Sequence, residues 1–166
     1  GTLEKPGDTD AFEFEARAGE TLVLDFAAKS IGSKIARGEL VLLDQSGRIV
    51  AQNSGFDGGD PLLTHTSAKS GRFTVRVSDR MAAGSKDHFY RLTIGALPFV
   101  TGVFPLGVSA NATNAVQLRG HNLGSRSFSR IQVKTTDAGE VEAPINAEKF
   151  RSRRSFKVIA SSAPEA

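Results

Sequence analysis

The sequence contains no cysteine and no tryptophan among its 166 residues. Without cysteine the chain can form neither disulfide bonds nor thiolate metal sites, although this leaves the cellular compartment open. A single tyrosine accompanies eleven phenylalanines. Faces that bind sugars usually display tryptophan and tyrosine, whose rings carry a polar group, so we expect the phenylalanines to lie in hydrophobic cores.

The sequence also lacks long hydrophobic runs and helical periodicity. No apolar run approaches the roughly 20 residues that a transmembrane helix needs. No window of ten or more residues repeats its apolar side chains with a helical period. The composition, 39% hydrophobic and 23% charged, is that of a folded globular protein. The length allows one ordinary domain or two small ones.

Sequence signatures of catalysis are missing as well. The three histidines, His65, His88 and His121, are far apart in the sequence and lack the spacing of a zinc site. No Gly-x-Ser-x-Gly motif is present, and the glycine-rich segments are not followed by a helix that could bind phosphate. We therefore expect no enzymatic activity. A hydrolase remains an alternative if His65 or His88 is bonded to both a serine and an aspartate in a pocket.

The chain begins with two strand-like segments. Phe12, Phe14 and Ala16 alternate with glutamates, which gives one apolar and one charged face. Residues 22–26 repeat this alternation after a turn that contains Gly19. We expect these two segments to form a β-hairpin.

Further short strand patterns follow up to residue 97. The clearest is 72–79, where Phe73, Val75 and Val77 share one face. With turn signals at nearly regular spacing, about seven or eight strands are expected in this region. This spacing favours an antiparallel β-sandwich. We expect its phenylalanines, Phe12 and Phe73 among them, to be enclosed between the two layers.

A second set of strands begins after Pro98, which marks the expected domain boundary. Five strands are expected, at residues 99–105, 115–120, 130–134, 140–143 and 155–160. The sequence thus predicts an all-β protein, with an antiparallel β-sandwich at 1–97, a smaller Ig-like sandwich at 98–160 and a linker at 161–166.

Charge is distributed unevenly between the two domains. Residues 1–97 contain 12 basic and 13 acidic residues, whereas residues 98–166 contain 9 basic and 5 acidic residues. The densest basic cluster is Arg151–Arg154, flanked by Lys149, Phe150 and Phe156. It could contact nucleic acid or an anionic glycan. The interpretation we favour is an exposed hairpin of the second domain, and we expect no nucleic-acid partner.

Four aspartates are candidate metal ligands. Asp8 and Asp10 lie just before the first strand, and Asp57 and Asp60 lie in a glycine-rich loop. Their oxygens could bind Ca²⁺, which takes 6–8 oxygen ligands, so further donors would be needed. The alternative is that all four are turn residues whose carboxylates accept backbone N–H bonds.

Several segments resemble known bacterial modules. Residues 6–14, 18–24, 40–47, 70–77 and 90–94 together resemble the bacterial pre-peptidase C-terminal domain, a secreted jelly-roll-type sandwich. The segment after Pro98, including 103–107 and 118–123, resembles an Ig domain of the IPT/TIG type.

The resemblance implies a non-catalytic module of a larger exported bacterial protein, located outside the cell or in the periplasm. Such a module would space or present neighbouring domains, or adhere to other molecules. Collagen-binding relatives hold Ca²⁺ near a Gly-Asp-x-Asp motif, which Asp8 and Asp10 match here. The alternative function is therefore a Ca²⁺-dependent binding module for an extracellular protein or glycan.

Overall fold

The computed structural model describes residues 1–56, 58–124 and 128–162. Within them, the regular structure consists of β-strands and one short turn of 3-10 helix, η1 (Lys29–Ile31), so the predicted all-β class is confirmed. The chain divides into two compact units, Gly1–Ala96 and Leu97–Ala166, next to the expected boundary. Each unit has a hydrophobic core of its own.

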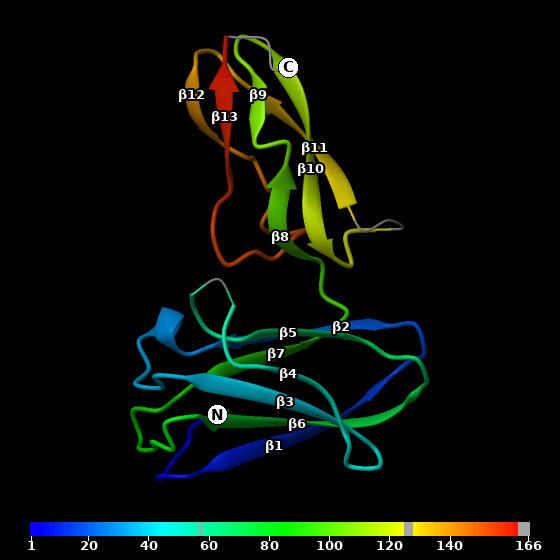
Figure 1. Cartoon of the computed structure of the whole chain (residues 1–166), viewed down its shortest axis with the longest axis vertical. Helices are drawn as coiled ribbons and strands as arrows, with labels where there is room; N and C mark the ends of the chain where they lie inside the picture. The colour runs from blue at the N-terminus through cyan, green and yellow to red at the C-terminus, as the bar shows by residue number, and fades with distance from the viewer. Residues whose placement is uncertain (57, 125–127, 163–166) are drawn as a thin grey trace. The chain divides into compact units, whose positions relative to one another are not determined.

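The first unit is a sandwich of two antiparallel sheets (Figure 1). Its strands are β1 (Thr9–Ala16), β2 (Thr21–Ala27), β3 (Gly38–Asp44), β4 (Ile49–Asn53), β5 (Leu62–Thr66), β6 (Gly71–Asp79) and β7 (Arg91–Gly95). One sheet has the order β1-β6-β3-β4, and the other has the order β5-β2-β7. The core lies between these two layers.

Strand β6 occupies the interior of the four-stranded sheet, between β1 and β3. Phe73, Val75 and Val77 are buried on one face, as their alternation predicted. β-Branched and aromatic side chains suit such a position because they pack well on a pleated, half-buried surface. The intervening side chains, Arg72 and Arg76 among them, form the outer face of the sheet.

The prediction that the first two strands form a β-hairpin is wrong. β1 pairs with β6, whereas β2 pairs with β5 and β7, so the two segments lie in opposite sheets. Both strands direct their apolar faces into one core, and each does so from its own layer. The connection is held against the β5–β6 turn, because Gly19 N–H donates to Ser67 O at 2.7 Å and Ser67 N–H donates to Glu20 O at 3.0 Å.

Phe12 departs from the expectation that it is enclosed. Its side chain is 40% exposed, whereas Phe73 is only 6% exposed. Strand β1 is the edge of its sheet, so one flank of the Phe12 ring has no neighbouring strand. The ring makes an edge-to-face contact with Tyr90, with centroids 6.5 Å apart. The sandwich is therefore less covered at this edge than the sequence pattern indicated.

The second unit contains two three-stranded sheets (Figure 1). Its strands are β8 (Phe99–Phe104), β9 (Gly107–Ser109), β10 (Thr113–His121), β11 (Phe128–Lys134), β12 (Gly139–Glu142) and β13 (Lys157–Ser161). The sheets have the orders β11-β10-β8 and β12-β13-β9. The five expected strands are present, and the three-residue β9, which pairs in parallel with β13, was not expected. Of the expected linker, Ser161 belongs to β13 and residues 163–166 lie outside the described residues.

Candidate functional sites

Asp60 is a buried carboxylate that holds the η1 turn. Its Oδ2 atom accepts a hydrogen bond from Ala28 N–H at 2.8 Å, and its Oδ1 atom accepts one from Lys29 N–H at 3.2 Å. A third bond, from Ser30 N–H to Oδ2, measures 3.4 Å. The side chain is 6% exposed. These contacts match the turn interpretation of Asp60, because the carboxylate satisfies amide groups at the start of η1.

Asp8 and Asp10 lie near the single tyrosine. Asp8 accepts bonds from Glu4 N–H at 2.7 Å and Thr9 N–H at 3.1 Å, as a turn residue does. Asp10 accepts a bond from the hydroxyl of Tyr90. Burial raises the pKa of Tyr90 above its ordinary value, and the hydrogen bond to Asp10 and the charges of Asp10 and Asp8 raise this pKa further.

The described residues contain no group of three or more His, Asp or Glu side chains placed to hold a metal ion. Asp57, the fourth candidate ligand, lies outside the described residues. Asp8 precedes β1, Asp10 is the second residue of that strand, and Asp60 is engaged with the amides of η1. A Ca²⁺ site on these aspartates would therefore need most of its oxygen ligands from water or backbone carbonyls.

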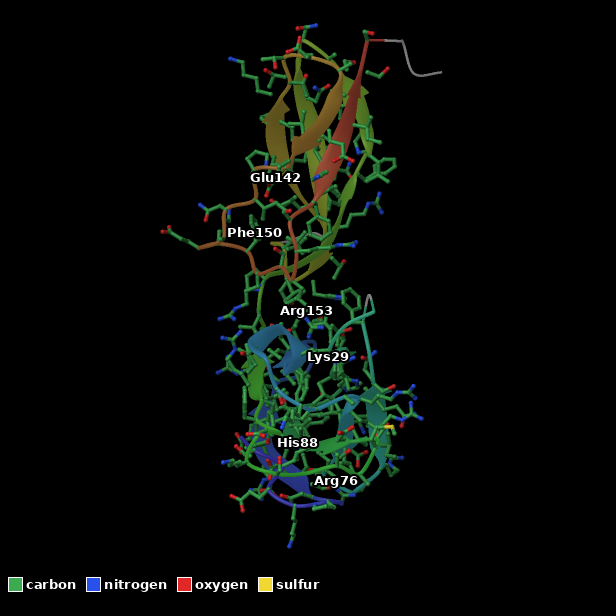
Figure 2. All side chains as sticks on the ribbon, turned by 90° about the vertical axis from the view of Figure 1, so that its left-hand side faces the viewer. Lys29, Arg76, His88, Glu142, Phe150 and Arg153 are labelled. Carbon is green, nitrogen blue, oxygen red and sulfur yellow. The ribbon has the colours of Figure 1, made fainter. Side chains whose placement is uncertain are left out.

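Among the described residues of the first unit, Ser85 and His88 are in hydrogen-bond contact; His88 is labelled in Figure 2. The Oγ atom of Ser85 lies 2.8 Å from Nδ1 of His88, which is 8% exposed. The same Oγ atom accepts a bond from Asp87 N–H at 3.2 Å, and His88 N–H donates to Ser85 O at 2.9 Å. Within the described part of the chain, no carboxylate is bonded to the His88 ring. These contacts stabilise the turn at residues 85–88. They do not form the hydrogen-bonded chain of nucleophile, base and orienting acid that a catalytic triad requires.

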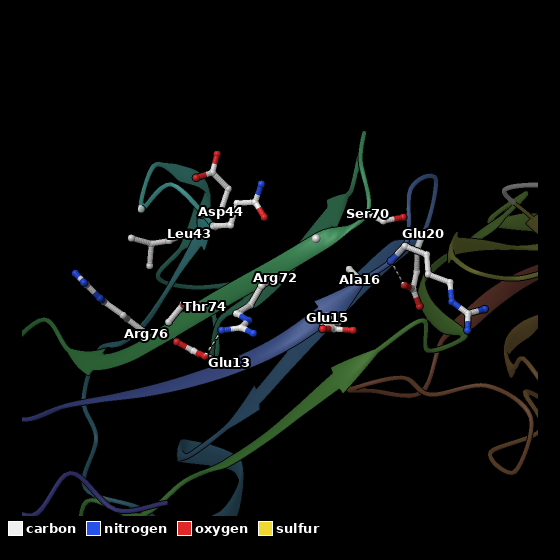
Figure 3. A pocket seen from close by; sticks show the side chains of 14 residues that line it. Glu13, Glu15, Ala16, Glu20, Leu43, Asp44, Ser70, Arg72, Thr74 and Arg76 are labelled. Atoms are coloured by element: carbon white, nitrogen blue, oxygen red, sulfur yellow. Dashed lines mark hydrogen bonds and ion pairs between the residues drawn. The ribbon is translucent and has the colours of Figure 1, made fainter.

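A polar groove lies on the outer face of the four-stranded sheet (Figure 3). Its volume is about 1060 Å³. Outward side chains of β1 and β6 line it, together with the turns at the ends of β1, β3 and β6. The charged lining residues are Glu13, Glu15, Arg17, Glu20, Asp44, Arg72 and Arg76. Those on β1 and β6 project outward because their neighbours along each strand face the core, which is a consequence of the two-residue period.

The groove combines both signs of charge over a short distance. Arg72 of β6 and Glu13 of β1 are diagonal neighbours on adjacent strands, and their charged atoms lie 3.6 Å apart. At one end, Asp44 accepts a bond from the Ser46 hydroxyl at 2.6 Å, and Arg48 also bonds to it. The Ser46 bond, supported by Arg48, holds the pKa of Asp44 well below its ordinary range. Such a surface can exchange hydrogen bonds and ion pairs with a polar chain lying along the strands.

The basic cluster Arg151–Arg154 is not a hairpin. Arg151 forms an isolated parallel bridge with Phe99, and its N–H donates to Pro98 O at 2.8 Å. Arg154 lies over the ring of Phe156, with its guanidinium carbon 5.2 Å from the centroid. Arg153, labelled in Figure 2, is partly buried. The expectation that this segment is exposed is met by Arg151 and Arg154, but its expected hairpin pairing is wrong.

Another surface was missed by the sequence analysis. We call it the β10 face, the outward side of the sheet β11-β10-β8. Its principal residues are Phe104, Gln117, Arg119, Phe128, Arg130 and Lys134. None of the three strands contains an aspartate or a glutamate. Part of the signal was available in residues 128–134, where Arg130 and Lys134 are four residues apart and so share one face of a strand. The pairing that brings them beside Arg119 is not local.

Comparison with known proteins adds no identification. A scan against protein-family models found no match, and neither did a search of curated proteins. Within the part of the chain that the structure describes, no helix is long and apolar enough to cross a membrane.

Proposed function

We propose that this chain is a non-catalytic interaction module of a larger exported bacterial protein, made of a pre-peptidase-C-terminal-like sandwich and an IPT/TIG-like sandwich. It would space or present neighbouring domains and adhere to an extracellular protein or glycan. The observation that carries this proposal is the open polar groove of about 1060 Å³ on the outer face of the first sandwich. A groove lined by exposed charges suits reversible recognition of a polar polymer.

The charged side chains of the groove support recognition rather than bond cleavage. Arg72 and Glu13 are both more than 60% exposed and neutralise one another. Hydrolysis would need a nucleophile and a base held in hydrogen-bond contact beside a substrate. The serine and histidine that are in contact, Ser85 and His88, bond to their own turn instead.

A Ca²⁺-dependent module has less support. Asp60 already accepts three backbone N–H bonds, and Asp10 accepts the hydroxyl of Tyr90. Recruiting either carboxylate to a metal would break contacts that the fold uses. Binding of an extracellular polymer that requires Ca²⁺ and is lost in Asp8→Ala or Asp10→Ala would favour this alternative.

A paired assay tests the proposal. The full chain is measured for binding to a panel of extracellular proteins and polysaccharides, and for turnover of ester, peptide and glycoside substrates. We expect saturable binding to at least one polymer, weakened about tenfold or more by Arg76→Glu in the groove. The matched variant Arg91→Glu, at an exposed position of β7 outside the groove, should bind as the wild type does.

Two results would contradict the proposal. One is the absence of binding to every polymer of the panel. The other is turnover that disappears in Ser85→Ala or His88→Ala, which would make the pair in that turn catalytic.

A further inference from the structure

The β10 face of the second unit combines aromatic rings with cations. The guanidinium carbon of Arg119 lies 5.0 Å from the centroid of Phe104, and that of Arg130 lies 5.8 Å from the centroid of Phe128. Phe104 is 52% exposed, and both arginines are exposed. These distances are within the range of cation–π attraction, which orients a guanidinium group and lowers its freedom.

Strand pairing arranges these groups in one array. Arg119 of β10 lies opposite Phe128 of β11, and Gln117 lies opposite both Arg130 and Phe104. Arg119 and Arg130 are therefore diagonal neighbours on the same face, with backbones about 7–8 Å apart. Lys134 follows Arg130 on the same side of β11, roughly 13 Å further along the strand. The positive charge thus extends in a line.

No acidic side chain neutralises this line within the sheet. Strands β8, β10 and β11 contain no aspartate or glutamate. Among the residues that the structure describes, no ion pair joins Arg119, Arg130 or Lys134 to a carboxylate. By contrast, Lys157 in the other sheet of this unit is paired with Glu140 at 2.7 Å. Arg119, Arg130 and Lys134 therefore form an exposed group of cations that is available to a ligand.

We propose that the β10 face binds an extended anionic polysaccharide, whose carboxylate or sulfate groups are held by Arg119, Arg130 and Lys134. Guanidinium groups recognise such anions through paired N–H donors. The amide of Gln117 can both donate to and accept from sugar hydroxyls. The inference rests on the proposed role as an interaction module outside the cell, because that role selects a polysaccharide among polyanions.

The geometry disfavours two other ligands. A single-stranded nucleic acid is usually held by stacking its bases on exposed aromatic rings. Here the rings of Phe104 and Phe128 are each engaged by a guanidinium group. A neutral glycan is usually packed on tryptophan or tyrosine, and the chain has no tryptophan and one tyrosine, Tyr90, which is buried in the other unit. Ionic interaction with an anionic ligand is therefore the means of recognition that this face offers.

The test is titration of the full chain with oligogalacturonate, a carboxylated polysaccharide, and with a neutral glucan of equal length. We expect oligogalacturonate to bind, with an affinity that falls as salt rises, and the glucan not to bind. Arg119→Gln and Arg130→Gln should each weaken binding about tenfold. Phe104→Leu should weaken it about threefold, because the ring no longer orients Arg119.

Arg91→Gln is the matched control, since it removes the same charge from an exposed residue of the first unit. Its affinity for oligogalacturonate should equal that of the wild type. Circular dichroism of each variant checks the fold. The inference is overturned if oligogalacturonate does not bind, if Arg91→Gln weakens binding as much as Arg119→Gln, or if single-stranded DNA of equal charge binds more tightly. If polymer binding is weakened by substitution of Arg76 but not of Arg119 or Arg130, the proposed interaction module still holds, and the assignment of binding to the β10 face is overturned.

Discussion

Asp60 connects two segments that are distant in sequence, the glycine-rich loop and the η1 turn. Its carboxylate is 6% exposed and accepts three backbone N–H bonds from residues 28–30. A buried N–H group that loses its acceptor retains the full cost of having left water. At the scale of the residue, this carboxylate has the strongest structural role among the candidate ligands that the structure describes.

The first prediction concerns this carboxylate. Asp60→Ala should lower the free energy of unfolding by about 3 kcal/mol, because buried amide donors lose a charged acceptor. Asp8→Ala is the control and should cost about 1 kcal/mol or less, since its turn amides are exposed and can bond to water. Urea unfolding of both variants measures the difference. Equal losses would show that the three bonds to Asp60 contribute little.

The second prediction concerns the pH dependence of stability through Tyr90. An unfolded tyrosine has a pKa of about 10, and burial together with Asp10 raises the pKa of folded Tyr90 above that value. The folded state therefore binds the phenolic proton more tightly. This contribution to stability is complete below about pH 10 and is lost as the pH rises above it.

Tyr90 is the only tyrosine, so phenolate absorbance reports on it alone. Phenolate should form only above the ordinary range of tyrosine, together with loss of structure. Tyr90→Phe should remove this source of alkaline destabilisation. A reversible titration near pH 10 with unchanged circular dichroism would show that folding does not perturb this pKa.

At the scale of the element, the pairing of β10 with β8 depends on Gly120. The pairing of β10 with β8 is irregular between Arg119 and Gly120. Gly120 has a φ of +155°, and a Cβ atom there would lie 1.9 Å from the carbonyl oxygen of Phe99. A bulge of this kind lets the strands approach more closely than a side chain would permit.

The third prediction is that Gly120→Ala destabilises the second unit by about 3 kcal/mol or more, because the clash involves backbone that cannot rotate away. Gly102→Ala in β8 is the matched control, since its added Cβ would meet nothing within 4 Å. Hydrogen exchange, resolved by residue, should show faster exchange in β8 and β10 for Gly120→Ala only. Equal protection in both variants would contradict the prediction.

The elements also show what sequence can and cannot predict. Side-chain alternation predicted β6 and its buried face, because the two-residue period is a local property. It did not predict the partner of β1, because Phe14 and Leu24 can face one core from the same sheet or from opposite sheets. The carboxylate of Asp60 was singled out by its type, but its amide partners are about 30 residues away and no local pattern reveals them.

At the scale of the whole molecule, the described chain is two sandwiches with separate cores. Charge is mixed on the groove of the first unit and of one sign on the β10 face of the second unit. The overall excess of basic residues in the second domain and the cluster at 151–154 were visible in the sequence. The grouping of Arg119, Arg130 and Lys134 on one face depends on the register of β10 and β11, which long-range pairing determines.

The fourth prediction tests binding through the β10 face most directly, by mapping amide NMR chemical shifts of the full chain during titration with oligogalacturonate. The account predicts that the largest changes fall in β8, β10 and β11, around Arg119 and Arg130, while the turn of Ser85 and His88 is unchanged. Changes concentrated at Ser85 and His88, or none in the three strands, would contradict it.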